Sequence, residues 1–522
     1  MNIFGCAVGV VLVRNVILPV VYPLRLVSLF QYIEMRFRSR LLRKYATACQ
    51  LTSCYIYVGI CLYAPSLALS SVTSLPTWAS VLVMGVVCTF YITIGGVKAV
   101  VYTDVLQTLV MFFGVLAVVA GRVPGHRRHH PGVGGRRGRT EAGVFQRALF
   151  RKAICFAQSQ RPGIHHPGRF FLCRAKPVRS GVASRLALTS IPIPSLDTSP
   201  FARHTLWSTL VVGVYMMISF LGLSQSQYQR FASVPTLAQA QMLALLFFLG
   251  LTLLWGTFYV SGLVAYAIYS DCDPLNSGKI EKADQIIPYM VSDKLGHLTG
   301  MPGLFVAAVY GGVLSSLSSE GNAIACVVWE DFLKERPYFR DISDRSATNV
   351  IKCLSSLTGL IAIGVGLLAG KLGTIYYVIS LIGAVIAGPL NGLFLAGMVI
   401  PWTNAKGAWA GMTFSLALNS WMVIGRTDEN TIYDISYCYN GAIGIISNLV
   451  VSSLVSCCTG PHLPGDVEAR LVYAPCARLY RSLFLLVGGG GGGAVTPRSR
   501  RSDGSGSGNA AQAGLILRKN DY

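Results

Sequence analysis

Long apolar stretches, separated by short polar segments, recur along most of this chain. A helix needs about 20 mostly apolar residues to cross the hydrocarbon core of a bilayer, and such windows occur eleven times. The pattern therefore predicts an all-α polytopic membrane protein with about eleven spans. The predicted spans are residues 3–22, 46–69, 77–94, 100–120, 205–222, 242–269, 302–327, 350–370, 375–400, 407–424 and 437–457.

Composition supports this interpretation and excludes an ordinary soluble domain. Hydrophobic residues make up 52% of the 522 residues and charged residues only 13%, against roughly 25% charged residues in soluble domains. The sequence holds no phosphate-binding loop, no nucleophile elbow and no cluster of histidine, glutamate and cysteine on an expected helix. We therefore expect neither an enzyme nor a resident metal centre.

Basic residues after the first span set the expected orientation. The segment with Arg25, Arg36 and Lys44 is rich in arginine, and short basic loops lie on the cytoplasmic side. Alternation from there places residues 330–349 inside and the loops 270–285 and 426–434 outside. With eleven spans, the N-terminus is expected to be external and the C-terminus internal.

The net charge of +22 comes largely from one segment. Residues 121–200 hold thirteen arginines and two lysines against two acids, and so supply +13. Their sequence shows no sustained hydrophobic period, which predicts a disordered insert or mistranslated residues rather than a nucleic-acid-binding domain. The alternatives are a basic arm for polyanions and a metal site made of His126, His129 and His130.

These features divide the chain into four parts. Residues 1–120 hold four predicted spans, residues 121–204 form the basic insert, and residues 205–458 hold seven further spans. Residues 459–522 form a predicted cytosolic tail that is rich in glycine and serine after 487.

The predicted span 302–327 contains polar residues that hydrocarbon does not favour. On a helix, Ser315, Ser316 and Ser319 fall within about 60° of the direction of Gly312. Small residues on one face allow close helix packing, whereas hydroxyl and carbonyl oxygens are also the donors that a hard cation prefers. Both interpretations stay open from the pattern alone.

Asp104 is a second candidate because it stands at the edge of an apolar stretch. An acid at membrane depth indicates a functional site. The alternative is that it stabilises the N-terminus of the span 100–120.

Several segments of the chain form a recognisable set: they include "QYIEMRF", "GVVCTFYITIGGVKAVVYTDVLQ", "QSQYQRF", "MPGLFVAAVYGGVLSSLSS", "EDFLK" and "AGPLNGLFLAGM". Together they resemble the sodium:solute symporter family, nearest its branch of sodium-coupled iodide, monocarboxylate and multivitamin transporters. The resemblance covers about residues 1–120 and 200–475.

The resemblance implies a thirteen-helix fold with an inverted repeat of five plus five helices and sodium-driven alternating access around a midplane site. This chain starts where the third helix of the family starts, so it is expected to lack the first two helices. The second of those is the broken helix that supplies the rest of the sodium site.

Carried over to this sequence, the family pattern implies a Na⁺ site on the span 302–327. Ser315 and Ser316 match its paired hydroxyls, Gly312 matches a carbonyl donor, and Asp104 matches the acid linked to the site. Ser319 shares their helix face and completes the predicted sodium-binding set.

Two further residues are predicted to lie along the substrate pathway. Gln225 follows the span 205–222, where an interhelical hydrogen bond is the alternative role. Tyr57 lies in the apolar span 46–69, where an aromatic residue also serves packing. Their assignment follows from family position, not from spacing.

Glu320 departs from the family pattern, which has a small or apolar residue there. A charged side chain at this depth is costly unless it is protonated, paired or hydrated. It is expected either to add a carboxylate to the sodium site, to make transport sensitive to protons, or to be a peculiarity of this sequence.

The resemblance implies sodium-coupled symport of a small organic anion, of monocarboxylate or vitamin type, across the plasma membrane. Iodide uptake is an alternative, although Met217 and Leu221 are aliphatic where the iodide transporter has aromatics. Two more hypotheses are a non-transporting fragment or incomplete gene model of such a symporter, and a membrane scaffold or receptor that binds through its basic loop. The expected partners are Na⁺, the anion and the lipid bilayer, with no nucleic acid.

Overall fold

The computed structural model describes residues 2–73, 75–120, 205–269, 273–369, 375–425 and 435–488. Within these ranges the chain is helical and contains no strand. The predicted insert 121–204, with the candidate metal ligands His126, His129 and His130, and the tail beyond 488 lie outside the described residues. The helices are α1 (Asn2–Leu12), α2 (Leu18–Val21), α3 (Gln31–Phe37), α4 (Arg40–Val72), α5 (Thr77–Ala120), α7 (Leu206–Met217), α8 (Gln225–Ala232), α9 (Leu237–Tyr269), α10 (Ile286–Leu295), α11 (Met301–Val328), α12 (Pro337–Arg340), α13 (Asp344–Ala369), α14 (Ile375–Val399), α15 (Ala405–Ile424), α16 (Asn440–Cys458) and α17 (Ala474–Gly488).

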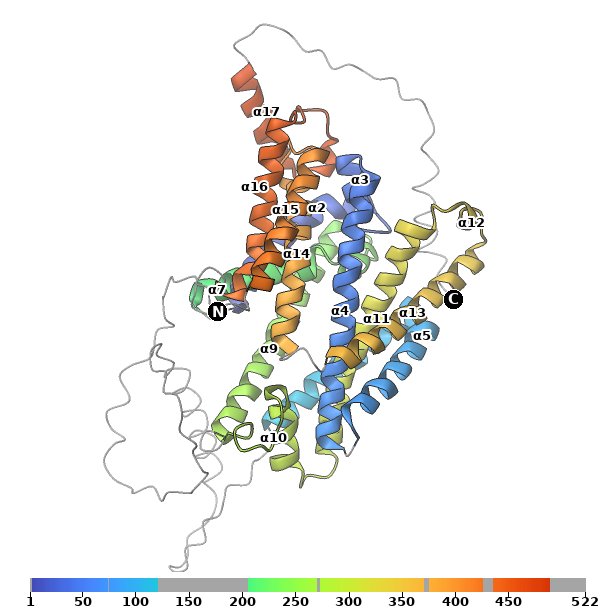
Figure 1. Ribbon diagram of the computed structural model, residues 1–522, viewed down its shortest axis with the longest axis vertical. Helices are drawn as coiled ribbons and strands as arrows, with labels where there is room; N and C mark the ends of the chain where they lie inside the picture. Colours follow the sequence, from blue (N-terminus) through green and yellow to red (C-terminus); the bar gives the residue numbers. More distant parts are fainter. Residues whose placement is uncertain are drawn as a thin grey trace, which may run out of the picture.

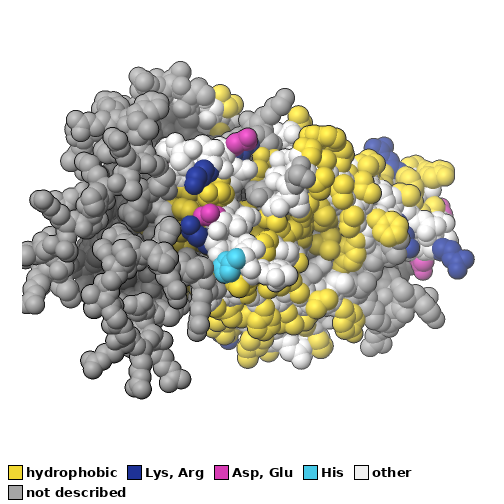
Figure 2. Space-filling model, turned by 90° about the horizontal axis from the view of Figure 1, so that it is seen from below, with side chains coloured by type: hydrophobic (Ala, Val, Ile, Leu, Met, Phe, Trp, Pro, Cys, Tyr) yellow, Lys and Arg dark blue, Asp and Glu magenta, His cyan; other side chains and the backbone are white. Residues whose placement is uncertain are grey.

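Seven helices in the described ranges are long and apolar enough to cross a membrane. An eighth span results if Leu206–Gly222 and Gln225–Ala232, which meet at a bend of 57°, count as one. Two shorter apolar stretches, Thr77–Thr93 within α5 and Gly383–Val399 within α14, accompany them. Apolar side chains cover much of the described surface, with few charges among them (Figure 2), as expected for a protein solvated by lipid.

The structure differs from the sequence prediction at residues 77–120. Two spans, 77–94 and 100–120, were expected there, but α5 is one continuous helix of 44 residues. A glycine inside a helix costs only about 1 kcal/mol relative to alanine, so the pair Gly95–Gly96 is not enough to end the helix.

The helices form two groups that share α4 (Figure 1). In one group α14 and α15 pack on α16, and α1 packs on α7. In the other, α4, α5, α11 and α13 pack on one another. Each group has its own buried apolar cluster, so the candidate residues of α11 belong to the second group.

Small residues allow the close approach of α15 and α16. Gly407 and Gly411 of α15 face Ser452 and Ser456 of α16. Such small-residue contacts are a common basis of helix association in membranes.

Gly407→Ala is expected to lower the free energy of unfolding by about 1–3 kcal/mol, the range for overpacking. A Cβ at this position would overlap the Ser452 carbonyl oxygen and the Ser456 hydroxyl. The midpoint of thermal unfolding in detergent measures the effect. Gly364→Ala on α13 is the matched control, because a Cβ there meets no atom within 4 Å; equal midpoints for the two variants would contradict the prediction.

A buried ion-pair network joins segments that the sequence assigns to the cytoplasmic side. Asp331, in the π-helical turn after α11, is paired with Arg43 of α4 and accepts hydrogen bonds from Thr47 Oγ1 at 2.7 Å and Ser28 Oγ at 3.1 Å. Arg43 also pairs with Glu34 of α3 at 2.8 Å. The two predicted internal segments, 25–44 and 330–349, therefore meet at one end of the bundle, while α10 lies at the other end (Figure 1).

Candidate functional site

Three of the four predicted sodium residues of α11, all except Ser319, line a cavity of about 410 Å³ between α5, α9 and α11. Gly312, Ser315 and Ser316 contribute one wall, while Thr108 of α5 and Phe258 of α9 contribute others. The lining thus combines hydroxyls with apolar side chains. This composition is typical of a small-molecule site, where a few polar groups fix orientation within an apolar cavity.

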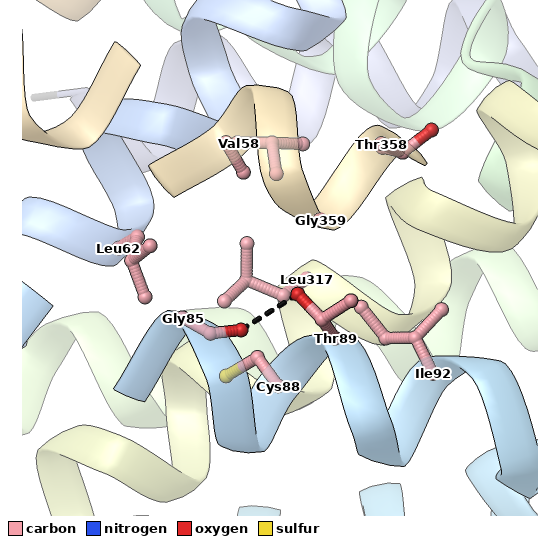
Figure 3. Close-up of a pocket in the computed structure, with 10 residues that line it drawn as sticks. Val58, Leu62, Gly85, Cys88, Thr89, Ile92, Leu317, Thr358 and Gly359 are labelled. Atoms are coloured by element: carbon pink, nitrogen blue, oxygen red, sulfur yellow. Dashed lines mark hydrogen bonds between the residues drawn. The ribbon is translucent and has the colours of Figure 1, made fainter. Parts of the chain in front are cut away.

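A second cavity, shown in Figure 3, has a different character. It lies between α4, α5, α11 and α13 and has a volume of about 10 Å³. Leu62, Ile92 and Leu317 point into it, and the Thr89 hydroxyl is engaged with the Gly85 carbonyl at 2.7 Å. A cavity this small holds at most about one water molecule, so it offers no site for a solute.

The hydroxyl of Ser316 and the carbonyl of Gly312 lie one turn apart and are hydrogen-bonded to each other at 3.0 Å. Both oxygens therefore point to the same side of α11. Tyr57 of α4 is half-buried and its hydroxyl interacts with the Ser316 side chain. The structure thus brings Tyr57 to the predicted sodium residues, next to the second of the two paired serines.

Asp104 reaches α11 from α5. Its Oδ2 atom accepts a hydrogen bond from Ser319 Oγ at 3.4 Å, and its carboxylate also interacts with the Ser315 side chain. Carboxylate and hydroxyl oxygens from two helices are hard donors of the kind that alkali cations bind. Asp104 lies inside the continuous helix α5, so the alternative role, stabilising the N-terminus of a span 100–120, is wrong.

Arg230 of α8 completes this cluster, and the sequence did not assign it to the site. Its Nη2 atom lies 2.8 Å from Asp104 Oδ2 and 2.7 Å from Ser319 Oγ. The Arg230 side chain is 44% exposed, whereas that of Asp104 is 15% exposed. The only sequence signal was a basic residue shortly after an apolar span in "QSQYQRF", which does not reveal its partner.

Glu320 follows Ser319 directly on α11, and its carboxylate points toward α4 and α8. Ser226 Oγ of α8 donates to Glu320 Oε1 at 2.5 Å, and Cys54 Sγ of α4 lies 3.9 Å from Oε2. Ser226 and Arg230 are one turn apart on α8 and share a face. The carboxylates of Asp104 and Glu320 therefore flank the same side of α8.

Gln225 makes two hydrogen bonds with the backbone before α3. Its Nε2 atom donates to the Val27 carbonyl at 2.9 Å, and its Oε1 atom accepts from the Leu29 amide at 2.7 Å. The side chain is 5% exposed. The structure places it away from the 410 Å³ cavity lining, in a position that ties α8 to the segment 25–30.

Gln225→Ala is expected to lower the free energy of unfolding by about 1–3 kcal/mol, because it leaves the buried Leu29 amide and the partly buried Val27 carbonyl without their partner. Thermal unfolding in detergent is the measurement, and Gln239→Ala at an exposed position of α9 is the control. If Gln225→Ala unfolds like the native chain but loses solute uptake, Gln225 belongs to the substrate pathway instead.

Comparison with known proteins decides the class. The model of the sodium:solute symporter family matches residues 2–123 and 193–414. The chain belongs to this family. The resemblance predicted from the sequence is confirmed, and with it a multi-pass membrane protein whose coupling ion is Na⁺.

Several individual relatives are similar in sequence to this symporter over most of its length. Human sodium-coupled monocarboxylate transporter 2 is 31% identical over 504 residues, which cover 90% of this chain and 73% of that protein. The human sodium/iodide cotransporter is 31% identical over 530 residues, covering 91% and 74%. Human sodium-coupled monocarboxylate transporter 1 is 33% identical over 416 residues, covering 80% and 60%.

A solved structure shares the fold of this symporter. A Na⁺-coupled sialic acid symporter in a substrate-bound outward-open state matches with a TM-score of 0.64 and 18% sequence identity, over 88% of this chain and 84% of that chain. At this identity the likeness concerns the fold and not the solute.

Proposed function

We propose that the chain couples the inward movement of Na⁺ to the uptake of a small organic anion, of monocarboxylate or vitamin type, across the plasma membrane. The observation that carries the proposal is the meeting of Ser315, Ser316 and Gly312 at one cavity, with Asp104 reaching the same helix from α5. These groups supply hydroxyl, carbonyl and carboxylate oxygens, which suit Na⁺. Relatives that are named as sodium-coupled monocarboxylate transporters support the class of solute.

The proposal includes the arrangement of an inverted repeat of five plus five helices. The bend of 57° between Leu206–Gly222 and Gln225–Ala232 supports a broken span, which in such repeats lies beside the solute and ion sites. Described helices also lie within each of the eleven predicted ranges, with 77–94 and 100–120 joined in α5.

The energetics are sufficient for uphill uptake. A tenfold sodium gradient supplies about 1.4 kcal/mol, and one charge crossing 100 mV supplies about 2.3 kcal/mol. Together, about 3.7 kcal/mol per Na⁺ supports roughly 500-fold accumulation of a neutral solute. An anion cancels the charge of one Na⁺, so a second Na⁺ is expected for electrically driven uptake.

Uptake into proteoliposomes tests the proposal. Radiolabelled short-chain monocarboxylates, biotin and iodide are compared, each with an inward gradient of sodium chloride or of choline chloride. We expect sodium-dependent accumulation of a carboxylate that an inside-negative potassium diffusion potential increases. Accumulation of iodide alone would replace the proposed solute, and equal uptake in sodium and choline for every compound would refute the function.

A further inference from the structure

One guanidinium lies beside two carboxylates from different helices. Arg230 Nη2 on α8 is paired with Asp104 Oδ2 of α5 at 2.8 Å and donates to Ser319 Oγ of α11 at 2.7 Å. Asp104 and Ser319 are among the predicted sodium ligands. Arg230 therefore occupies two oxygens of the proposed sodium set, so Na⁺ and Arg230 would compete for Asp104.

The second carboxylate, Glu320, follows Ser319 directly on α11. Ser226 holds it at 2.5 Å, and Ser226 lies one turn before Arg230 on the same face of α8. The Arg230 charge acts on Glu320 electrostatically. In the described part of the chain, Glu320 has hydrogen-bonding neighbours but no salt bridge, which is a costly state for an ionised acid inside a span.

The geometry points to Arg230 as an internal cation that exchanges between these two carboxylates. Na⁺ binds Asp104 and displaces the guanidinium, which then pairs with Glu320. The inference rests on the proposed sodium site and concerns its regulation. It also gives Glu320 a role, because without a second carboxylate the displaced charge of Arg230 would be left without an acidic partner.

The exchange links sodium binding to the bent span. Arg230 belongs to α8, the half of the span that follows the 57° bend. While Arg230 is paired with Asp104 it ties α8 to α5, and after exchange it ties α8 to α11 through Glu320. Sodium binding therefore changes the ion-pair partner of α8 from α5 to α11, although Na⁺ itself does not contact α8.

Binding of ²²Na⁺ to the purified full chain in detergent tests this switch, and needs no knowledge of the solute. Arg230→Gln removes the competing cation and is expected to strengthen sodium binding about fivefold. This factor corresponds to the ~1 kcal/mol that a partly exposed ion pair contributes. Glu320→Gln is expected to weaken it by a similar factor, because Arg230 loses its second partner. Asp104→Asn is expected to abolish the effect of both.

The double variant Arg230→Gln with Glu320→Gln gives the decisive comparison. A switch predicts that Glu320→Gln has no effect once Arg230 is absent, whereas simple attraction between Glu320 and Na⁺ predicts the same weakening in both backgrounds. The additive result would overturn the inference, as would unchanged binding in both single variants. Arg230→Lys keeps the charge and is expected to keep the dependence on Glu320.

Controls separate folding and transport from the switch. Arg345→Gln and Glu281→Gln make the same changes at exposed positions and are expected to bind ²²Na⁺ like the native chain. Monodisperse elution on size exclusion identifies the variants that fold. The variants could bind sodium with the expected pattern while the native chain shows no sodium-dependent solute uptake in proteoliposomes. That result would refute the proposed function but support the switch.

Discussion

Replacing both Ser315 and Ser316 by alanine is expected to abolish sodium-dependent uptake while the chain still folds. A hydrogen bond or dipole directed at a charged group contributes about 1.5–3 kcal/mol, so loss of two hydroxyls corresponds to a weakening of sodium binding by about 100-fold or more. The sodium concentration for half-maximal uptake is the measurement, with ²²Na⁺ binding as a second one.

The same double variant separates the two interpretations of the polar face of α11. Alanine is as small as serine, so a role in helix packing alone predicts little change in uptake or stability. Ser355→Ala is the matched control, since this buried serine of α13 donates to the backbone of its own helix at 3.0 Å. If the double variant keeps the native sodium dependence of uptake, the assignment of Ser315 and Ser316 to the sodium site is wrong.

Asp331→Ala is expected to cause the largest loss of stability, about 3–5 kcal/mol, which is the range for breaking a buried ion pair. The Asp331 side chain is 0% exposed and that of its partner Arg43 is 8% exposed, so removal of the acid leaves the buried Arg43 charge with Glu34 as its remaining acidic partner. Thr47 and Ser28 lose their acceptor as well. Thermal unfolding in detergent, together with the yield of folded protein, measures the effect.

Glu335→Ala serves as the comparison for Asp331→Ala. Glu335 pairs with Lys44 at 3.1 Å in the same region, but the two side chains are 37% and 40% exposed. Exposed pairs contribute about 0–1 kcal/mol. The Lys44 ammonium also holds the pKa of the Glu335 carboxyl below its usual value. The small stabilisation of the folded state by this pair is therefore lost when pH falls through the lowered pKa. Similar losses in the two variants would show that burial does not make the Asp331 pair stronger.

The helical membrane architecture followed from the sequence because its cause is local. Transfer of an apolar segment into hydrocarbon depends on the composition of about 20 consecutive residues, so the predicted spans fall on helices. The boundary within α5 was not predictable in the same way. Residues 94–100 interrupt the apolar pattern, yet helical hydrogen bonds continue through them.

The candidate site was predicted in part. The residues of α11 were found because polar groups within an apolar span are anomalous wherever the helix packs, and Asp104 was found for the same reason. Gln225 was also noticed as polar, but its hydrogen bonds to Val27 and Leu29 join segments 198 and 196 residues apart. No pattern near Gln225 carries that information.

The sequence by itself determined the class of protein, the positions of most spans and the helix face that carries hydroxyls. Only the tertiary structure decided which charges meet: Arg230 lies 126 residues from Asp104 along the chain, and Glu320 lies 94 residues from Ser226. The physical reason is that burial in lipid is a property of each segment alone, whereas the partner of a charge inside the membrane depends on how distant helices pack.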